Sequence, residues 1–158
     1  MVKVKMVLGW CIPMVLVVVA LMTPAIAQAG SIKIWPDQMK PYYPNSDHYQ
    51  EPSMVANGHF SAPFTLPVGA RITKITYYYE GVGVTAGTSF YVYRIKMGNR
   101  HEQLGWEHSE GSTSGQVIAV DVPVTGDSSI RKGYRYYVQA SSANLSSYFM
   151  GVKIDYQE

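Results

Sequence analysis

The sequence predicts an all-β protein, an antiparallel β-sandwich that is jelly-roll-like and has about eight strands. Three observations lead to this prediction. Segments that alternate apolar and polar residues recur along the chain, and glycine-containing turn sequences separate them. After the N-terminal segment, no window shows the i, i+3, i+4 apolar spacing of an amphipathic helix. The connections are too short for crossover helices, so neighbouring strands must be largely antiparallel.

The first element, residues 1–29, is interpreted as a signal peptide. Two lysines precede an apolar stretch at 6–22, and small residues follow it at positions that fit a cleavage site. We expect cleavage after Ala27 or Ala29, and export to the extracellular space, the cell surface or the periplasm. The alternative is an uncleaved membrane anchor. It is disfavoured because the apolar stretch is near the lower length limit for spanning and Pro13 interrupts it. Membrane contact is therefore expected only through this segment during export.

The net charge of the chain depends on the same segment. The 158 residues carry a formal charge of +2, with 47% hydrophobic and 15% charged residues, a composition that excludes a disordered chain. Removing the predicted signal peptide removes Lys3, Lys5 and the single cysteine, Cys11, and leaves 11 basic against 11 acidic residues. Nucleic acid is not an expected partner, because phosphate binding needs a concentrated positive face.

Residues 30–53 are expected to form an extended arm rich in proline and tyrosine. Four prolines in this span exclude a helix and leave little room for a central strand. A short strand at Ser31–Trp35 can open the arm, which then packs on a neighbouring molecule or on its own sandwich. The β-sandwich domain is predicted to span residues 54–158.

Three segments of this domain alternate clearly, and each has one face that is predicted to be buried. The three predicted core faces are Ile118, Val120, Val122 and Val124; Tyr134, Tyr136, Val138 and Ala140; and Tyr148, Met150, Val152, Ile154 and Tyr156. In the third segment, Phe149 is placed on the opposite face.

Two further segments give mixed patterns. At 89–97, the better core face is formed by Tyr91, Tyr93, Ile95 and Met97, with Phe90 and Val92 on the other side. At 71–79, one face carries Ile75, Tyr77 and Tyr79, while Ile72 falls on the other face, which indicates either a β-bulge or partial cover of that face. Residues 60–66 and 104–108 are weaker strand candidates.

Three short motifs carry a resemblance to a protein family. The chain reads FSAPFTLPVGA at 60–70, then ITKITYYYE at 72–80, and GVKIDY at 151–156. The pattern F-x-A-P-x-x-L-P-x-G-A, followed by Y-Y-Y and by G-V-[KR]-I-x-Y, resembles a group of uncharacterised exported bacterial β-sandwich proteins. The resemblance covers roughly residues 55–157 and implies a jelly-roll-type sandwich. It implies no activity and supplies no site residues.

The sequence shows no catalytic constellation. No serine lies in a Gly-x-Ser-x-Gly motif, and the only cysteine is in the predicted signal peptide. A metal site can be drawn from His101, Glu102, His108 and Glu110, but their irregular spacing favours a polar, solvated hairpin. We therefore predict no enzyme activity, no metal site and no cofactor.

The aromatic residues are the most unusual feature of the sequence. All 13 tyrosines follow residue 29, and runs such as Tyr77-Tyr78-Tyr79 must place rings on both faces of a strand. One set of rings then packs in the core, while the other meets water or a partner. The alternative is that tyrosine is an ordinary half-buried strand residue here. The candidate contact residues for a partner or a glycan are Trp35, Tyr42, Tyr43, Tyr49, Tyr91 and Trp106.

These observations leave two functions open. The first is a non-enzymatic structural or self-assembling component of the cell surface or envelope, whose partner is another copy of the same chain. The second is a carbohydrate- or ligand-binding module that uses exposed aromatic residues and has a surface glycan as its partner.

Overall fold

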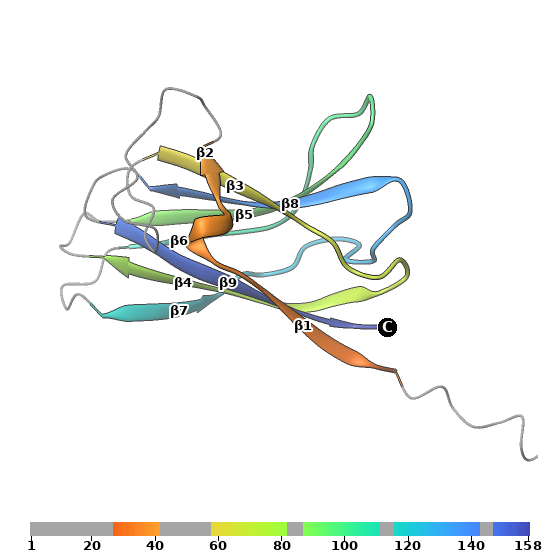
Figure 1. The fold of residues 1–158 in the computed structure, drawn as a ribbon, viewed down its shortest axis with the longest axis horizontal. Helices are drawn as coiled ribbons and strands as arrows, with labels where there is room; N and C mark the ends of the chain where they lie inside the picture. The colour runs from red at the N-terminus through yellow and green to blue at the C-terminus, as the bar shows by residue number, and fades with distance from the viewer. Residues whose placement is uncertain (1–26, 42–57, 82–86, 111–115, 143–146) are drawn as a thin grey trace, which may run out of the picture.

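A computed structural model describes residues 27–41, 58–81, 87–110, 116–142 and 147–158, which form two packed β-sheets (Figure 1). These residues contain nine strands and one short 3-10 helix. The elements are β1 (Ala29–Ile34), η1 (Pro36–Gln38), β2 (Lys40–Pro41), β3 (Gly58–Phe64), β4 (Arg71–Gly81), β5 (Thr88–Lys96), β6 (Glu102–Ser109), β7 (Val117–Asp121), β8 (Tyr134–Ser142) and β9 (Ser147–Gln157). No helix in these ranges is long and apolar enough to cross a membrane.

Both sheets pair strands that are distant in the sequence. One sheet has the order β1-β9-β4-β7, the other has the order β2-β3-β8-β5-β6, and the strand pairs are antiparallel. Apart from the two-residue strand β2, the remaining eight strands form two four-stranded sheets with the connectivity of a jelly roll. The predicted fold class is therefore confirmed.

Stacked aromatic rings fill the centre of the sandwich. Phe90 of β5 stacks on Tyr77 of β4 and on Phe149 of β9, with ring centroids 5.2 and 6.1 Å apart. All three side chains are almost fully buried, and the Tyr77 hydroxyl hydrogen-bonds with Ser109. Burial raises the pKa of Tyr77 to about 12, so the phenol is neutral in the folded protein. These rings join the two sheets through a single cluster.

Two of the three clear alternation patterns are confirmed. In β8, Tyr136, Val138 and Ala140 are buried, and Tyr134 packs partly against the core. The residues of the 117–124 pattern also face the core, with Val122 buried and its alternating neighbours partly buried. The β-bulge suggested near Ile72 is present as well, because the pairing of β4 with β9 shifts register between Ile72 and Lys74.

The face of strand β5 that packs in the core is the opposite of the predicted one. Phe90 and Val92 are buried, whereas Tyr91 and Tyr93 lie on the outer side, and Met97 is 93% exposed. The prediction that Tyr91, Tyr93, Ile95 and Met97 face the core is wrong. The reason is residue 94, which follows Phe90 and Val92 on the inner face of the strand.

That residue is Arg94, which is only 2% exposed. Its guanidinium donates hydrogen bonds of 2.8 and 2.7 Å to the two carboxylate oxygens of Glu102, and one of 2.9 Å to the carbonyl of Asp127. It also lies over the ring of Tyr134, 5.4 Å from the centroid. A charge that is paired and hydrogen-bonded in this way can be buried, so an arginine in the pattern does not mark a solvent-exposed face.

In β9 the predicted face holds only from Val152 onward. Phe149 is in the core, and Tyr148 and Met150, which were predicted to be buried, are only partly so. A register shift causes this, because Gly151 pairs with Tyr78 but Phe149 pairs with the next residue of β4, which leaves Met150 as an extra residue. A β-bulge of this kind exchanges the two faces of the strand on either side of it.

The first part of the predicted arm belongs to the sandwich. The strand expected at 31–35 is present as β1, which begins at Ala29, in the region of the predicted cleavage site, and pairs with β9 along its whole length. Met39, beyond η1, is fully buried. Residues 42–57 lie outside the described residues, as does most of the predicted signal peptide.

Candidate functional site

Four aromatic side chains and one histidine form a continuous row on the outer face of the five-stranded sheet. In order they are Trp106, Tyr91, Tyr93, Tyr137 and His101, with successive ring centroids 6.3, 5.8, 5.3 and 5.5 Å apart. The first four rings stack, with successive planes inclined by 16°, 14° and 27°. His101 meets Tyr137 edge-on, and its Nδ1 atom shares a hydrogen bond with the Tyr137 hydroxyl. We call these five side chains the aromatic row.

Strand pairing places the members of the aromatic row beside one another. Trp106 of β6 is the register partner of Tyr91 on β5, and Tyr137 of β8 is the partner of Tyr93. Tyr91 and Tyr93 are two residues apart on one strand, so they share a face. Directly opposed residues have Cβ atoms about 4.5–5.5 Å apart, which brings large rings into contact. The row therefore crosses three hydrogen-bonded strands, which hold it in place from beneath.

Polar side chains flank the aromatic row on the same face. Gln139 of β8 is the register partner of Tyr91, and Ser61 of β3 is the partner of Gln139. Two residues before Tyr91 on β5, and therefore on the same face, the Ser89 hydroxyl hydrogen-bonds with Nδ1 of His108 at 2.9 Å. Amide, hydroxyl and imidazole groups beside stacked rings suit a ligand that has both apolar faces and hydroxyl groups.

The outer face around the row carries no carboxylate at the described positions of β3, β5, β6 and β8. The acids of β6 fall on the other side, where Glu102 pairs with Arg94 and Glu107 is the register partner of the core residue Phe90. Hydrogen bonding from Arg94 holds the pKa of Glu102 below its usual value, so Glu102 remains an ionised partner of that guanidinium. With Arg135 exposed on β8, this face is neutral to weakly basic.

Trp106 is the most accessible large ring of the row. It is 51% exposed, whereas Tyr91, Tyr93 and Tyr137 are partly buried, and each of these has at least two ring neighbours. A ring that is already fixed by its neighbours loses little conformational entropy when it binds a ligand. The row is thus a preorganised surface that ends in an open indole.

Two of the six predicted contact residues belong to the aromatic row. The structure brings Tyr91 and Trp106 together in the aromatic row and places Trp35, 56% exposed, on the other sheet. The other three, Tyr42, Tyr43 and Tyr49, lie outside the described residues.

Three members of the row, Tyr93, Tyr137 and His101, were not among the predicted contact residues. Two signals were available for the tyrosines. Tyr93 is two residues after Tyr91, so both side chains lie on the same face of the strand. Tyr137 is next to the buried Tyr136, so its side chain lies on the opposite, outer face. His101 precedes β6 and carried no such signal.

The four residues from which a metal site was drawn do not form one cluster. His101 hydrogen-bonds with Tyr137, and His108 hydrogen-bonds with Ser89. The Glu102 carboxylate is held by Arg94. Within the described ranges, no group of three or more His, Cys, Asp and Glu side chains is placed to hold a metal ion.

Comparison with known proteins finds similarity among solved structures. No family model matches the sequence, and no curated protein matches it. Among solved structures, the chain is similar to the carbohydrate-binding module TmCBM61 in its complex with β-1,4-galactotriose. The TM-score is 0.38 and the identity 10%, with 85% of this chain and 88% of that chain covered.

Proposed function

We propose that this protein is an exported, non-enzymatic glycan-binding module that holds a polysaccharide chain along its aromatic row. The observation that supports this proposal is the line of four stacked rings, from Trp106 through Tyr91 and Tyr93 to Tyr137, on the outside of a rigid sheet. Such rings offer apolar contact to the C–H groups of a sugar, and their polar tips offer hydrogen bonds to its hydroxyls.

The length of the row favours a chain over a single sugar. The rings span β6, β5 and β8, and Gln139 and Ser61 extend the polar surface towards β3. A ligand that touches several of these rings must itself be extended. The absence of carboxylates at the described strand positions of this face favours binding over hydrolysis, because glycoside cleavage usually employs a pair of carboxyl groups across the bond.

A substitution experiment with a matched control tests this proposal. Trp106→Ala and Tyr91→Ala remove rings from the row, and Val68→Ala removes an exposed apolar side chain from the turn between β3 and β4. Affinity electrophoresis through neutral cell-surface and plant polysaccharides identifies a ligand, and calorimetry with its oligosaccharides measures the affinity. We expect either row substitution to weaken binding about tenfold or more, equivalent to about 1.4 kcal/mol, and the control to leave it unchanged.

Two results would count against a glycan-binding row. One is that the protein migrates unretarded in every polysaccharide. The other is that Val68→Ala weakens binding as much as Trp106→Ala. Circular dichroism and the unfolding midpoint of each variant establish that the sandwich is intact, so that a loss of binding is not a loss of fold.

The other function left open by the sequence, a structural or self-assembling surface component, stays a prediction. Light scattering after size exclusion tests it over a range of protein concentrations. A monomer at every concentration argues against self-assembly, and it leaves glycan binding untouched.

A further inference from the structure

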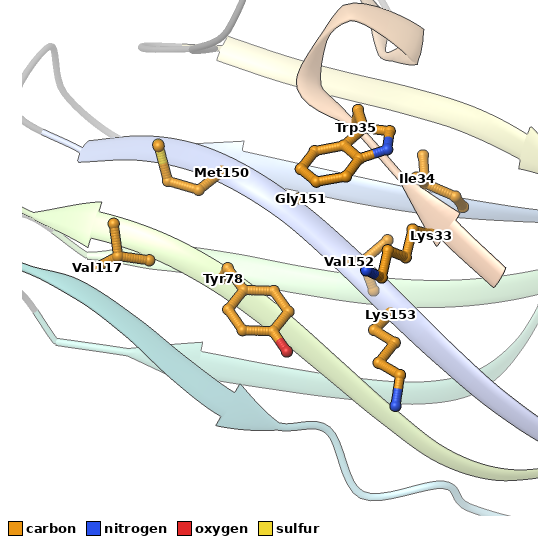
Figure 2. Close-up of a pocket in the computed structure, with 9 residues that line it drawn as sticks. All are labelled: Lys33, Ile34, Trp35, Tyr78, Val117, Met150, Gly151, Val152 and Lys153. Atoms are coloured by element: carbon orange, nitrogen blue, oxygen red, sulfur yellow. The ribbon is translucent and has the colours of Figure 1, made fainter. Parts of the chain in front are cut away.

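The outer face of the other sheet contains a hollow of about 290 Å³. Figure 2 shows its arrangement: Trp35 and Tyr78 lie on either side of strand β9, Lys33 and Lys153 lie together at one end, and Met150 and Val117 lie at the other. The aromatic and aliphatic groups make its surface mostly apolar. Its size is at the lower end of ligand sites, so it fits one small cyclic unit rather than a length of polymer.

The floor of this hollow depends on a glycine. Gly151 has a φ of +135°, a conformation that side-chain-bearing residues rarely adopt. A Cβ atom placed there would lie 3.1 Å from the Ile34 carbonyl oxygen and 4.0 Å from the Trp35 ring. The missing side chain therefore lets the end of β1 and the indole lie close against β9, where the ring forms one wall of the hollow.

Two like charges face each other at one end of the hollow. Lys33 of β1 and Lys153 of β9 are direct register partners, and both are on the outer side of the sheet. Like charges in directly opposed positions destabilise a strand pair. Asp155 forms a salt bridge of 2.8 Å with Lys153, whereas Lys33 lies 6.0 Å from the centroid of the Trp35 ring and forms no ion pair with a described carboxylate. An anion beside Lys33 and Lys153 would relieve this repulsion.

The remaining charges on this face are arranged around the hollow rather than in it. Lys74 is paired with Asp121 at 3.0 Å, one strand further away. Glu80 is the register partner of Val117, beyond the apolar end. A bound anion is therefore attracted to the lysine end and repelled from the opposite end, which gives the site a direction.

We propose that this hollow is a second binding site, for a single hexuronate unit, a pyranose that carries a carboxylate. The apolar face of the sugar packs on Trp35 and Tyr78, and the carboxylate lies beside the ammonium groups of Lys33 and Lys153. Because the hollow and the aromatic row are on opposite sheets, the two sites bind separate ligands or separate chains. This second site does not require the aromatic row to bind glycan.

Nuclear magnetic resonance of the indole N–H groups of Trp35 and Trp106 tests the proposal in a site-resolved way. Trp35 reports on the hollow and Trp106 on the aromatic row, and the two signals are assigned with Trp35→Phe and Trp106→Phe. The purified protein is titrated with trigalacturonate, with the corresponding neutral trigalactoside and with phenylacetate. We expect trigalacturonate to shift the Trp35 signal at concentrations about tenfold below those the neutral sugar requires.

Substitutions at the lysine end separate charge from shape. Lys33→Met should abolish the preference for trigalacturonate over the neutral sugar, and Lys33→Arg should retain it. Lys96→Met, which removes an exposed lysine from β5 on the other sheet, should leave the preference unchanged. Raising the salt concentration should weaken the response of Trp35 to trigalacturonate, because the attraction between exposed charges is screened.

Three results would overturn the second site. The first is a Trp35 signal that trigalacturonate leaves in place. The second is an equal response of Trp35 to the charged and the neutral sugar. The third is a response to phenylacetate as strong as that to trigalacturonate, which would assign the hollow to small aromatic acids. None of these results bears on the aromatic row, whose failure would appear as an unresponsive Trp106.

Discussion

Both faces of strand β5 carry aromatic side chains, but the rings on the two faces make different contacts. On the inner face, Phe90 is fully buried and stacks on Tyr77 and Phe149 from the opposite sheet. On the outer face, Tyr91 and Tyr93 stack on each other and on rings of the adjacent strands of their own sheet. The inner rings connect two layers and exclude water, whereas the outer rings lie on one layer and stay partly accessible. The odd or even position of an aromatic residue along this strand therefore decides whether its ring packs between the sheets or lies on the outer face.

The largest expected effect is a difference in stability between the two faces. Phe90→Ala should lower the free energy of unfolding by about 3–5 kcal/mol, because it opens a cavity in the aromatic cluster between the sheets. Tyr91→Ala should lower it by about 1 kcal/mol or less, since it removes only cross-strand contacts on an open face. Urea titration of both variants measures the difference. Equal losses for the two substitutions would show that the outer rings are structural.

The ion pair at the end of the inner face should give a smaller, pH-dependent effect. Arg94 holds the pKa of Glu102 below its usual 4.5, so the folded protein binds this proton less readily than the unfolded chain does. The resulting stabilisation is present above about pH 4.5 and is lost as the pH falls through the lower folded pKa.

Glu102→Gln tests this contribution. It should lower stability at neutral pH and reduce the loss of stability on acidification. Thermal unfolding midpoints from pH 7 to pH 3 measure both effects. An acid transition that is the same in the variant and the original protein would assign the pH dependence to other carboxyls. One such group is Asp127, whose pKa is held down by hydrogen bonds from Ser129 and by Arg131.

The smallest expected effect concerns the first residue of the inner face. Thr88 is 1% exposed, and its hydroxyl has no hydrogen-bond partner among the described residues, so its burial has an uncompensated cost. Thr88→Val keeps the shape of the side chain and removes the hydroxyl, and it should raise the free energy of unfolding by about 1 kcal/mol. Ser89→Ala, on the outer face, is the matched control and should change stability little. A loss of stability in Thr88→Val would mean that the hydroxyl is hydrogen-bonded in solution.

The sequence predicted burial best in segments where apolar and polar residues alternate without interruption. Val138 and Ala140 are buried as their parity predicts, and the same holds for Val152 and Ile154 in the second half of β9. The prediction failed where a single residue interrupted the rule. At Arg94 the interruption was a paired charge in the core, and at Met150 it was an unpaired residue in a bulge. Both depend on contacts with segments that are distant in the sequence.

For the candidate sites, too, the sequence predicted some features and missed others. Trp106 and Trp35 could be selected from the sequence as large rings outside a predicted core face, and Tyr91 as one ring of a segment with a mixed pattern. Their grouping could not, because the contact of Tyr93 with Tyr137 depends on β5 pairing with β8, and two other strands lie between these in the chain. The opposition of Lys33 and Lys153 likewise arises only when the first strand pairs with the last.

The sequence by itself determined that this chain forms an antiparallel β-sandwich, because alternation and turn residues act over short distances and are visible in any window. It also singled out the aromatic residues as the candidate contact surface. Only the tertiary structure decided which rings are inside and which form a row, and that two lysines meet at the end of a hollow. The reason is physical: strand register, bulges and buried ion pairs are set by hydrogen bonds and contacts between residues far apart in the chain.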